Sequence, residues 1–343
     1  MKNLRTLLAG LLIITGNFSY GQDVHFSQVG FSPLTLNPAL AGANGAINGV
    51  INYRSQWASV AKPYNTMAAS FDMRVMESKN GIFAVGLNFF NDQSGESRIS
   101  QNSVNLHLAY HMFMNDQHSI GVGIYGGWGQ NALTLNDDKW GIQYDGAAYN
   151  ETIGSGENFA RQSFSYIDAG AGILYSFNDS RSGFSSDEGK RVNAGFAIYH
   201  VNEPSYSFVA AANDNLKMRM SGFVDALITL NGSRNSIRPG AYVNFQNGSK
   251  EIVLGTYYRY MATQGSQITG LKKPLYLSLG GFYRFGDAFI TKFMAEFHEY
   301  SLGLAYDFNV SNLSTFSRSL GGFELFLRYN MPQMGGIGSK ARI

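Results

Sequence analysis

The stretch Pro274-Leu-Tyr-Leu-Ser-Leu-Gly-Gly-Phe-Tyr-Arg-Phe-Gly286 alternates between two kinds of side chain. A β-strand places successive side chains on opposite faces, so this order produces one apolar face and one face of small, polar and charged residues. The same alternation recurs at 47–57, 82–90, 300–309 and 320–330. In 274–286 the apolar face carries Leu275, Leu277, Leu279, Tyr283 and Phe285, opposite Tyr276, Ser278, Gly280 and Arg284.

Polar or glycine-rich breaks divide the chain into fourteen candidate strands. Several are longer than the roughly five to six residues usual in a soluble sheet, and a membrane-crossing strand needs about 9–11 residues. The sequence therefore predicts strands that begin near residues 47, 63, 81, 98, 118, 161, 191, 216, 236, 250, 274, 288, 299 and 319.

Strands with alternating apolar and polar side chains occur in two architectures, a soluble β-sandwich and a transmembrane barrel. The two differ in where the apolar face points. In the barrel that face meets lipid, and aromatic residues gather at the membrane interfaces. Long strands, their even number and aromatic strand ends favour the barrel. We predict an all-β fold, a transmembrane antiparallel β-barrel of about 14 strands over residues 47–330. The aromatic ends are Tyr53 and Trp57, Tyr258 and Tyr260, and Tyr300 and Phe308.

The composition of the 343 residues excludes several classes of protein. Charged residues make up 15% and aromatic residues 14%, which is too little charge and too much aromatic content for disorder. A net charge of +2 gives no electrostatic case for nucleic acid. With no cysteine, disulfides and thiolate metal sites are excluded. Mean hydropathy is −0.14, and beyond the first residues no apolar run of about 20 predicts a membrane helix.

The first 21 residues have the pattern of a secretory signal peptide. Lys2 and Arg5 precede a short apolar core, Leu7 to Ile14, and Ser19-Tyr20-Gly21 supplies small residues at a cleavage site. We predict Sec-dependent export with cleavage after Gly21, and then an integral protein in the outer membrane of a Gram-negative bacterium.

The strand phases send charged side chains to the inner face of the predicted barrel. Six are basic and five acidic, so a pore selective for one sign of ion is not indicated. Two interpretations stay open: a network that braces the wall, since buried charges need partners, and a binding surface for a polypeptide or solute. The inward set is Arg54, Arg74, Arg219, Arg259, Arg284, Arg328, Asp72, Asp168, Asp225, Asp307 and Glu324, of which Arg54, Asp72, Arg74, Arg259, Arg284, Asp307 and Glu324 are candidate partner contacts.

Motifs for catalysis are weak. Gly121 to Gly126 matches GxGxxG, but Gly126-Gly127-Trp128-Gly129 follows where a helix should begin, so we interpret it as a glycine-rich strand with close packing. His107 and His111 share a strand face about 13 Å apart, too far for one metal. We therefore predict no enzyme activity, no catalytic residues, no metal site and no cofactor.

Residues 22–46 are predicted to form an N-terminal segment at the periplasmic mouth of the barrel. Pro33 and Pro38 forbid a central strand, and the segment is too apolar to extend into water. It folds into or across the mouth, either as an ordered clasp or as a plug or docking element. Its candidate contacts are Phe26, Phe31, Asn37 and Pro38. Residues 331–343 are predicted to form a flexible periplasmic tail.

The longest loop, Thr134 to Ala160, falls on the cell exterior by strand parity. It carries Asp137, Asp138, Trp140 and Tyr144, which we predict as partner contacts. Asp137, Asp138 and Asp145 could together hold calcium, although their spacing is not that of an EF-hand. Met261 to Lys273 is periplasmic by the same count, although its length suits the exterior better.

Several blocks together resemble the PorP/SprF family of type IX secretion-associated outer-membrane proteins, in order from residue 22 to 330. Asn37-Pro-Ala39 alone is weak, because fatty-acid-channel barrels show it too. The blocks are Asp23-Val-His-Phe-Ser-Gln28, Pro33-Leu-Thr-Leu-Asn-Pro-Ala-Leu-Ala-Gly42, Tyr53-Arg-Ser-Gln-Trp57, Pro63-Tyr-Asn-Thr66, Ser70-Phe-Asp72, Tyr283-Arg-Phe-Gly-Asp-Ala288, Tyr306-Asp-Phe-Asn-Val-Ser-Asn-Leu313, Gly321-Gly-Phe-Glu324 and Leu327-Arg-Tyr329.

The resemblance implies a lipid-embedded barrel that serves the export or surface anchoring of a large secreted type IX adhesin, through the adhesin or its C-terminal domain. Periplasmic type IX or peptidoglycan-binding proteins are further implied partners. Two alternatives stay open. One is a core structural subunit of the secretion machinery, and the other is a solute channel of the fatty-acid-transporter type.

Overall fold

The computed structural model describes residues 23–60, 62–95, 99–133, 141–150, 152–154, 162–179, 189–209, 214–230, 233–265, 273–311 and 314–331. Its strands are β1 (Ile47–Gln56), β2 (Tyr64–Glu77), β3 (Gly81–Ser94), β4 (Ile99–Phe113), β5 (His118–Ala132), β6 (Ser163–Asp179), β7 (Lys190–Tyr199), β8 (Arg219–Thr229), β9 (Ser236–Gln246), β10 (Ser249–Thr263), β11 (Leu275–Arg284), β12 (Ala288–Phe297), β13 (Tyr300–Asn309) and β14 (Leu320–Met331). The signal peptide, the tail beyond Met331, and Asp137, Asp138 and Trp140 lie outside the described residues.

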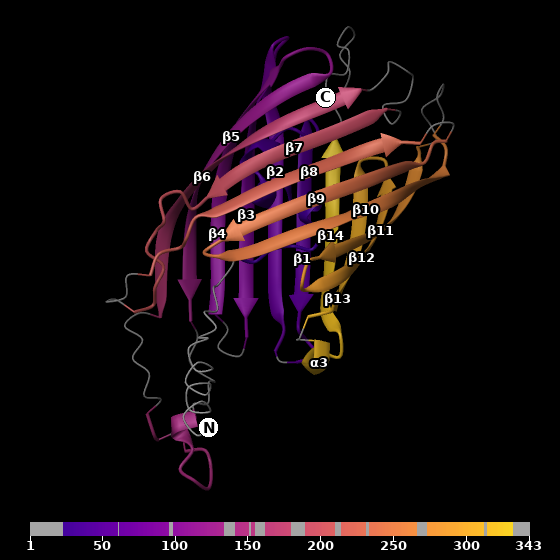
Figure 1. Ribbon diagram of the computed structural model, residues 1–343. Coiled ribbons are helices and arrows are strands. Elements are labelled where there is room, and N and C mark those ends of the chain that lie inside the picture. The colour runs from indigo at the N-terminus through magenta and orange to yellow at the C-terminus, as the bar shows by residue number, and fades with distance from the viewer. Residues whose placement is uncertain are drawn as a thin grey trace, which may run out of the picture.

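The fourteen strands form one closed antiparallel barrel (Figure 1). Each strand pairs with the next along the chain, and β1 closes the ring against β14 with Ile47 opposite Met331 and Gln56 opposite Gly322. Closure removes free sheet edges, so the backbone ladder is satisfied within the wall, as a hydrocarbon environment requires. The predicted fold class is confirmed.

The strand beginnings lie close to those that the sequence predicts. The largest difference is three residues, at β8, which begins at Arg219 instead of 216. The predicted list of strands has one inconsistency, at 261–273. Strand parity places this connection on the periplasmic side, although its length suits the exterior better. β10 and β11 are paired neighbours along Val253 to Thr263 of β10, as the predicted order of strands requires.

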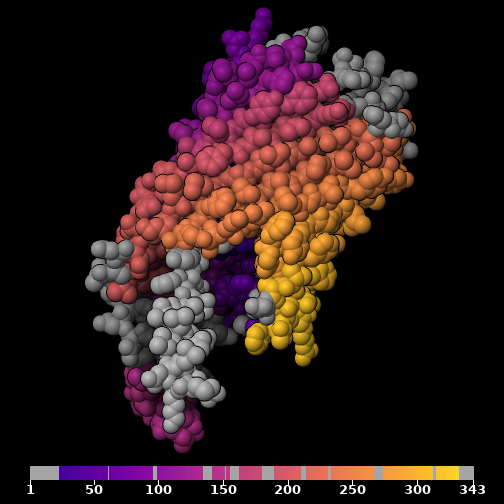
Figure 2. All heavy atoms as spheres, viewed as in Figure 1, coloured from indigo at the N-terminus to yellow at the C-terminus, as the bar shows by residue number. Residues whose placement is uncertain are grey.

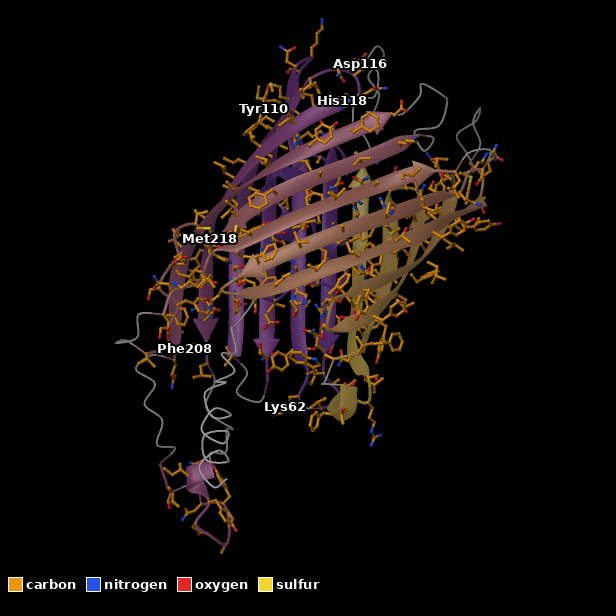
Figure 3. The ribbon with its side chains drawn as sticks, viewed as in Figure 1. Lys62, Tyr110, Asp116, His118, Phe208 and Met218 are labelled. Carbon is orange, nitrogen blue, oxygen red and sulfur yellow. The ribbon has the colours of Figure 1, made fainter. Side chains whose placement is uncertain are left out.

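The barrel has two ends, which we define by the strands. The near end is where β1 begins and β14 ends. The far end is where β13 connects to β14 through the short helix α3 (Ser314–Ser317). Figure 3 shows Asp116 and His118 at the near end, and Lys62 and Phe208 toward the far end. An even number of strands places the start of the barrel and its end on the same side, which we expect to be the periplasm.

The outer wall is apolar and the inner face is polar and glycine-rich, as the alternation predicts. In β11 the outward Leu279 is 63% exposed, whereas its neighbour Ser278, on the inner face, is 1% exposed. Tyr110 of β4 likewise lies on the outer side (Figure 3). Figure 2 shows this wall as a continuous surface across the strands that face the viewer. Exposed apolar side chains on such a surface are what contact with lipid requires.

Residues 23–46, which we call the N-terminal segment, precede β1 and lie inside the barrel. They form three short turns: η1 (Val29–Phe31), α2 (Pro33–Leu36) and η2 (Pro38–Leu40). Pro33 and Pro38 each stand at the first position of a turn, where a missing N–H costs nothing. A further turn, η3 (Gly141–Gln143), lies in the long far-end loop.

In the described part of the chain, no helix is both long and apolar enough to cross a membrane.

Candidate functional site

The N-terminal segment runs through the lumen from the far end to the near end. Asp23 contacts Gln246, the last residue of β9 at the far end. At the near end, the backbone N–H of Ala46 donates a hydrogen bond to the carbonyl of Met331. Phe26, which we predicted at the near-end mouth, packs edge-on against Phe90 in the far half. The predicted placement at the mouth was therefore wrong. The segment lies deeper because the lumen walls offer paired charges and apolar surface that the mouth alone does not.

Six buried charged residues, which we call the anchor cluster, hold the first part of the segment. Three are basic and three acidic, so their charges balance inside the wall. They come from β1 and from the neighbouring strands β10 to β14, which closure of the barrel brings around one point. The anchor cluster consists of Arg54, Glu251, Arg284, Lys292, Asp307 and Glu324.

Ser27 is the residue that the anchor cluster surrounds. The Glu324 carboxylate accepts two backbone N–H groups, from Ser27 at 2.6 Å and from Gln28 at 2.9 Å. Lys292 Nζ donates to the Ser27 carbonyl at 2.6 Å, and Arg284 Nη2 donates to its hydroxyl at 2.8 Å. That hydroxyl donates to Asp307 at 2.6 Å. All polar groups of this buried residue are satisfied, and several of the bonds are charge-assisted.

The charged side chains also pair with one another, which offsets the cost of burying them. Arg54 lies 3.0 Å from Asp307 and also donates to the His25 carbonyl. Arg284 lies 3.2 Å from the same carboxylate and 3.4 Å from Glu251. The inward charges therefore brace one another and also bind the chain's own N-terminal segment.

Asn37 and the residues after it rest on glycines of the wall. The Asn37 side chain donates to the carbonyl of Ile173 at 2.9 Å, and its own oxygen accepts the Ala39 N–H at 2.8 Å. A Cβ added at Gly123 would come closer than 3.0 Å to the Ala39 backbone, and one at Gly172 would do the same to Asn37. The GxGxxG sequence is therefore a packing surface within β5, as we interpreted it.

Aromatic contacts fill the middle of the lumen beside these polar contacts. Phe31 stacks on Phe326 with ring centroids 4.3 Å apart, and it meets Tyr257 edge-on at 6.4 Å. Both pairs lie within a buried apolar cluster that also includes Leu36 and Leu40. Burying each such side chain contributes roughly 1.5–3 kcal/mol, so the segment is held by packing as well as by charge.

Near the other end, the loop before β1 is fixed by a second set of polar contacts. Asp72 accepts the Gly42 N–H at 2.8 Å, and Arg74 donates to the Gly42 carbonyl at 2.8 Å. His111 donates to the Ala41 carbonyl at 2.7 Å. Gly42 has a φ of +72°, a left-handed conformation that glycine adopts without strain. The segment is thus tied at both of its ends.

At the far end, Asp23 of the segment is held by Asp168, His200 and Arg219 of the wall, and we call these four residues the far-end clasp. The two imidazole nitrogens of His200 lie 2.7 Å from Asp23 and 2.9 Å from Asp168. Burial lowers the pKa of His200, but the two carboxylates outweigh it and raise the pKa to about 9. The imidazole is therefore a cation at neutral pH that bridges the wall to the segment.

The predicted inward charges all face the lumen. Arg54, Asp72, Arg74, Arg284, Asp307 and Glu324 contact the N-terminal segment directly or through one another. Arg259 pairs with Glu296 at 2.7 Å and lies over the ring of Tyr276. Within the described ranges, no group of three or more His, Cys, Asp or Glu could hold a metal ion.

Sequence reasoning missed Lys292 and Glu251 of the anchor cluster and His200 of the far-end clasp. The signal for Lys292 was present, because Ala288, Ile290, Lys292 and Met294 alternate with outward residues in β12. The signal for Glu251 was also present, because it shares the inward phase of Arg259 in β10. His200 directly follows β7 and so lies outside the alternating strand.

Most described residues of the far-end loop between β5 and β6 are exposed. Tyr144 forms an isolated bridge with Tyr149 and is 59% exposed. The Asp145 carboxylate accepts the backbone N–H groups of Ala147 and Ala148, which lower its pKa and commit it to a local turn. The remaining predicted contacts, Asp137, Asp138 and Trp140, lie outside the described residues.

Comparison with solved structures agrees on the fold. The Ralstonia pickettii toluene transporter TbuX has a TM-score of 0.50 and 11% identity, over 88% of this chain and 94% of that chain. A Pseudomonas aeruginosa FadL homologue has a TM-score of 0.45 and 10% identity, over 86% and 94%. BamA of Haemophilus ducreyi has 0.42 and 9%, over 83% and 70%. At these identities the likeness to TbuX shows an outer-membrane barrel fold alone. No curated protein matches the chain.

The sequence profile of one family matches residues 18–329, which is nearly the whole chain and includes the N-terminal segment, β1 to β13 and most of β14. Its description is type IX secretion system membrane protein PorP/SprF. The chain is thus an outer-membrane β-barrel that belongs to the PorP/SprF family of type IX secretion system membrane proteins.

Proposed function

We propose that this barrel is a non-enzymatic binding partner in type IX secretion, needed for the export or the surface anchoring of a large secreted adhesin. One observation carries the proposal beyond the family: the chain's own N-terminal segment occupies the lumen along its depth. A barrel filled in this way offers its two ends, and not an open pore, to other molecules. Its function is then to hold a partner at one end.

The charges inside the barrel support the same conclusion. Glu324 and Asp72, which could have bound a passing polypeptide or solute, already bind Ser27, Gln28 and Gly42. To open the lumen, the protein would have to expose the balanced charges of the anchor cluster to an incoming molecule, and a buried charge that loses its partner costs several kcal/mol, roughly 3–5. This argues against the solute channel as the main activity.

The far end is the favoured contact surface for an adhesin. On the expected orientation it faces the cell exterior, and it carries exposed aromatic side chains such as Tyr144 and Phe316. Aromatic residues are enriched at protein interfaces, because one side chain supplies a large contact area at low entropic cost. The near end would instead suit the alternative, a structural subunit that contacts periplasmic or peptidoglycan-binding proteins.

The test is to delete the gene and measure the adhesin in the periplasm, at the cell surface and in the medium. Loss from the surface with accumulation in the periplasm indicates export, and loss with release into the medium indicates anchoring. An adhesin that is still exported and attached in the deletion strain contradicts the proposal. A simultaneous loss of solute uptake would then favour the channel.

A pair of variants separates the two ends. Tyr144 at the far end and Met114 at the near end are both 59% exposed, so Tyr144→Ser and Met114→Ser remove matched apolar surface. We expect Tyr144→Ser to lower the adhesin at the surface severalfold and Met114→Ser to leave it unchanged. The reverse result would favour the structural-subunit alternative.

A further inference from the structure

A cavity in the far half of the lumen lies between the N-terminal segment and strands β3 to β8 of the wall. Its volume is about 70 Å³, whereas one water requires roughly 10–15 Å³, so it has room for one small organic molecule. Leu34 and Thr35 of the segment form one side. On the wall, His107 of β4 is 1% exposed and stacks on Tyr125 of β5 with ring centroids 5.4 Å apart. We call this space the histidine cavity.

The inward side chains of β4 show that the histidine cavity is reached from the far end. β4 begins at that end with Ile99, and Gln101, Ser103 and Asn105 are each partly exposed, whereas His107 is buried. The last four all line the cavity. A strand rises about 3.3 Å per residue, so Gln101 and His107 are separated by roughly 20 Å along β4. A molecule that enters from the far mouth therefore passes amide and hydroxyl groups before it meets the imidazole.

Two side chains of the histidine cavity have buried polar atoms that lack a partner among the described residues. Both ring nitrogens of His107 are unpaired, and so is Oδ1 of Asn88, which is 4% exposed. In the β3–β4 ladder Asn88 pairs with Asn105 and Gly86 with His107, so Asn88 and His107 are diagonal neighbours roughly 7–8 Å apart. Buried polar groups are almost always hydrogen-bonded, so these atoms indicate an occupant that bonds to both.

The charged side chains that line the histidine cavity are those of the far-end clasp, two acidic and two basic, and they contact one another. Arg219 lies 3.5 Å from Asp23, donates to the Thr35 carbonyl at 3.3 Å and lies over the ring of Tyr199. A ligand of either sign would meet a like charge in this clasp. The cavity therefore favours an uncharged occupant.

The unpaired atoms require an occupant that both donates and accepts hydrogen bonds. Oδ1 of Asn88 accepts, and an uncharged imidazole has one N–H that donates and one nitrogen that accepts. A hydroxyl group donates and accepts, so a molecule with several hydroxyls can serve both residues. A sugar ring has hydroxyls at its edge and C–H groups on its faces, which pack on aromatic rings. Aromatic side chains line much of the remaining surface: Phe90, Tyr125, Tyr166 and Tyr199.

We propose that the histidine cavity binds a sugar ring, either free or at the end of a glycan that enters from the far end. His107 and Asn88 bind hydroxyls on opposite edges of the innermost ring. A glycan continues from there along Asn105, Ser103 and Gln101 toward the far mouth. The proposal does not depend on the adhesin, and it gives the far end a ligand of its own.

The test is calorimetric titration of the barrel with its N-terminal segment, in a detergent without a sugar headgroup. The probes are D-glucose, D-galactose, D-mannose, maltose and lactose, with toluene and benzoate for comparison. We expect saturable binding of at least one sugar and none of toluene or benzoate. Tighter binding of a disaccharide than of the hexoses would show that the sugar ends a glycan, and the opposite order that it is free.

Two results would overturn the proposal. One is no saturable binding of any of the five sugars, which would show that water alone fills the histidine cavity. The other is binding of toluene or benzoate as tight as that of the best sugar.

Two variants and a matched control locate the binding. His107→Phe keeps a ring against Tyr125 but removes both nitrogens, so sugar affinity should fall at least about tenfold. Neither nitrogen has a partner in the described part of the protein, so thermal unfolding without sugar should be unchanged. Asn88→Leu removes the acceptor at similar volume and should weaken binding about tenfold.

His118→Phe is the control, because it makes the same exchange at the near end of the barrel (Figure 3). It should change sugar affinity less than about twofold, since distant sites act independently. Sugar binding that survives in both His107→Phe and Asn88→Leu, or that falls equally in His118→Phe, would refute the assignment.

Discussion

Replacing Glu324 by Gln should loosen the N-terminal segment inside an intact barrel. Glu324 is 1% exposed and accepts the N–H groups of Ser27 and Gln28 at 2.6 Å and 2.9 Å. Glutamine keeps one acceptor oxygen but turns an NH₂ group toward the other N–H. It also removes one of the three negative charges that balance the anchor cluster. The ladder of β14 is unaffected, because it is made by the backbone.

The magnitude follows from the bonds lost. A hydrogen bond to a charged group contributes about 1.5–3 kcal/mol net, so loss of one such bond should lower the protection of the two amides about 10- to 100-fold. Glu324→Ala removes both acceptors and should cost about 3–6 kcal/mol. The remaining contacts of the segment, at Phe31, Asn37 and Gly42, should keep its later part docked.

The assay is amide hydrogen exchange of Ser27 and Gln28, with conductance in planar bilayers as a second readout. Glu296→Gln is the matched control, because Glu296 is a lumen carboxylate that pairs with Arg259 and not with the segment. We expect faster exchange and transient conductance for Glu324→Gln alone, with the heat-modifiable gel migration of a folded barrel retained. Unchanged protection at Ser27 and Gln28, or equal changes in the control, would refute the reasoning.

Two further predictions concern the other contacts of the segment. Gly123→Ala should destabilise docking of the N-terminal segment, because the new Cβ would lie closer than 3.0 Å to the Ala39 backbone. Gly126→Ala in the same strand meets nothing within 4 Å and should be neutral or stabilising. Thermal unfolding of the two variants checks this. The pKa of His200, about 9, lies above its unfolded value, so its stabilising effect is complete below roughly pH 6.5 and is lost as the pH rises through about 9. Hydrogen exchange around Asp23 should therefore accelerate between these pH values, and exchange that follows only its intrinsic pH dependence would contradict the prediction.

The wall of the barrel could be predicted closely because its determinants are local. The period of two in a strand is fixed by backbone geometry, so each stretch reports its own two faces without reference to its neighbours. Turn residues at the breaks then fix where each strand ends. β11 shows this: the inward Ser278 and outward Leu279 follow from the sequence of that strand alone.

The contents of the lumen could be predicted only in part. Strand phase identified Arg54, Arg284, Asp307 and Glu324 as inward, but not what they bind. Their partner, Ser27, is separated from Glu324 by 297 residues in the chain, and nothing in either local sequence specifies that contact. The segment was also placed too near the mouth, because apolarity and two prolines show that it must be buried without showing how deeply.

The sequence by itself determined the number of strands, which face of each meets lipid, and the near-balance of charge inside, because alternation and turn residues act over a few positions. Only the tertiary structure decided that the N-terminal segment fills the lumen, that Glu324 holds its backbone, and that side chains from β3 to β8 surround one cavity. The physical reason is closure: it brings strands that are distant in the chain around a common interior, and packing and charge pairing there depend on the whole ring at once.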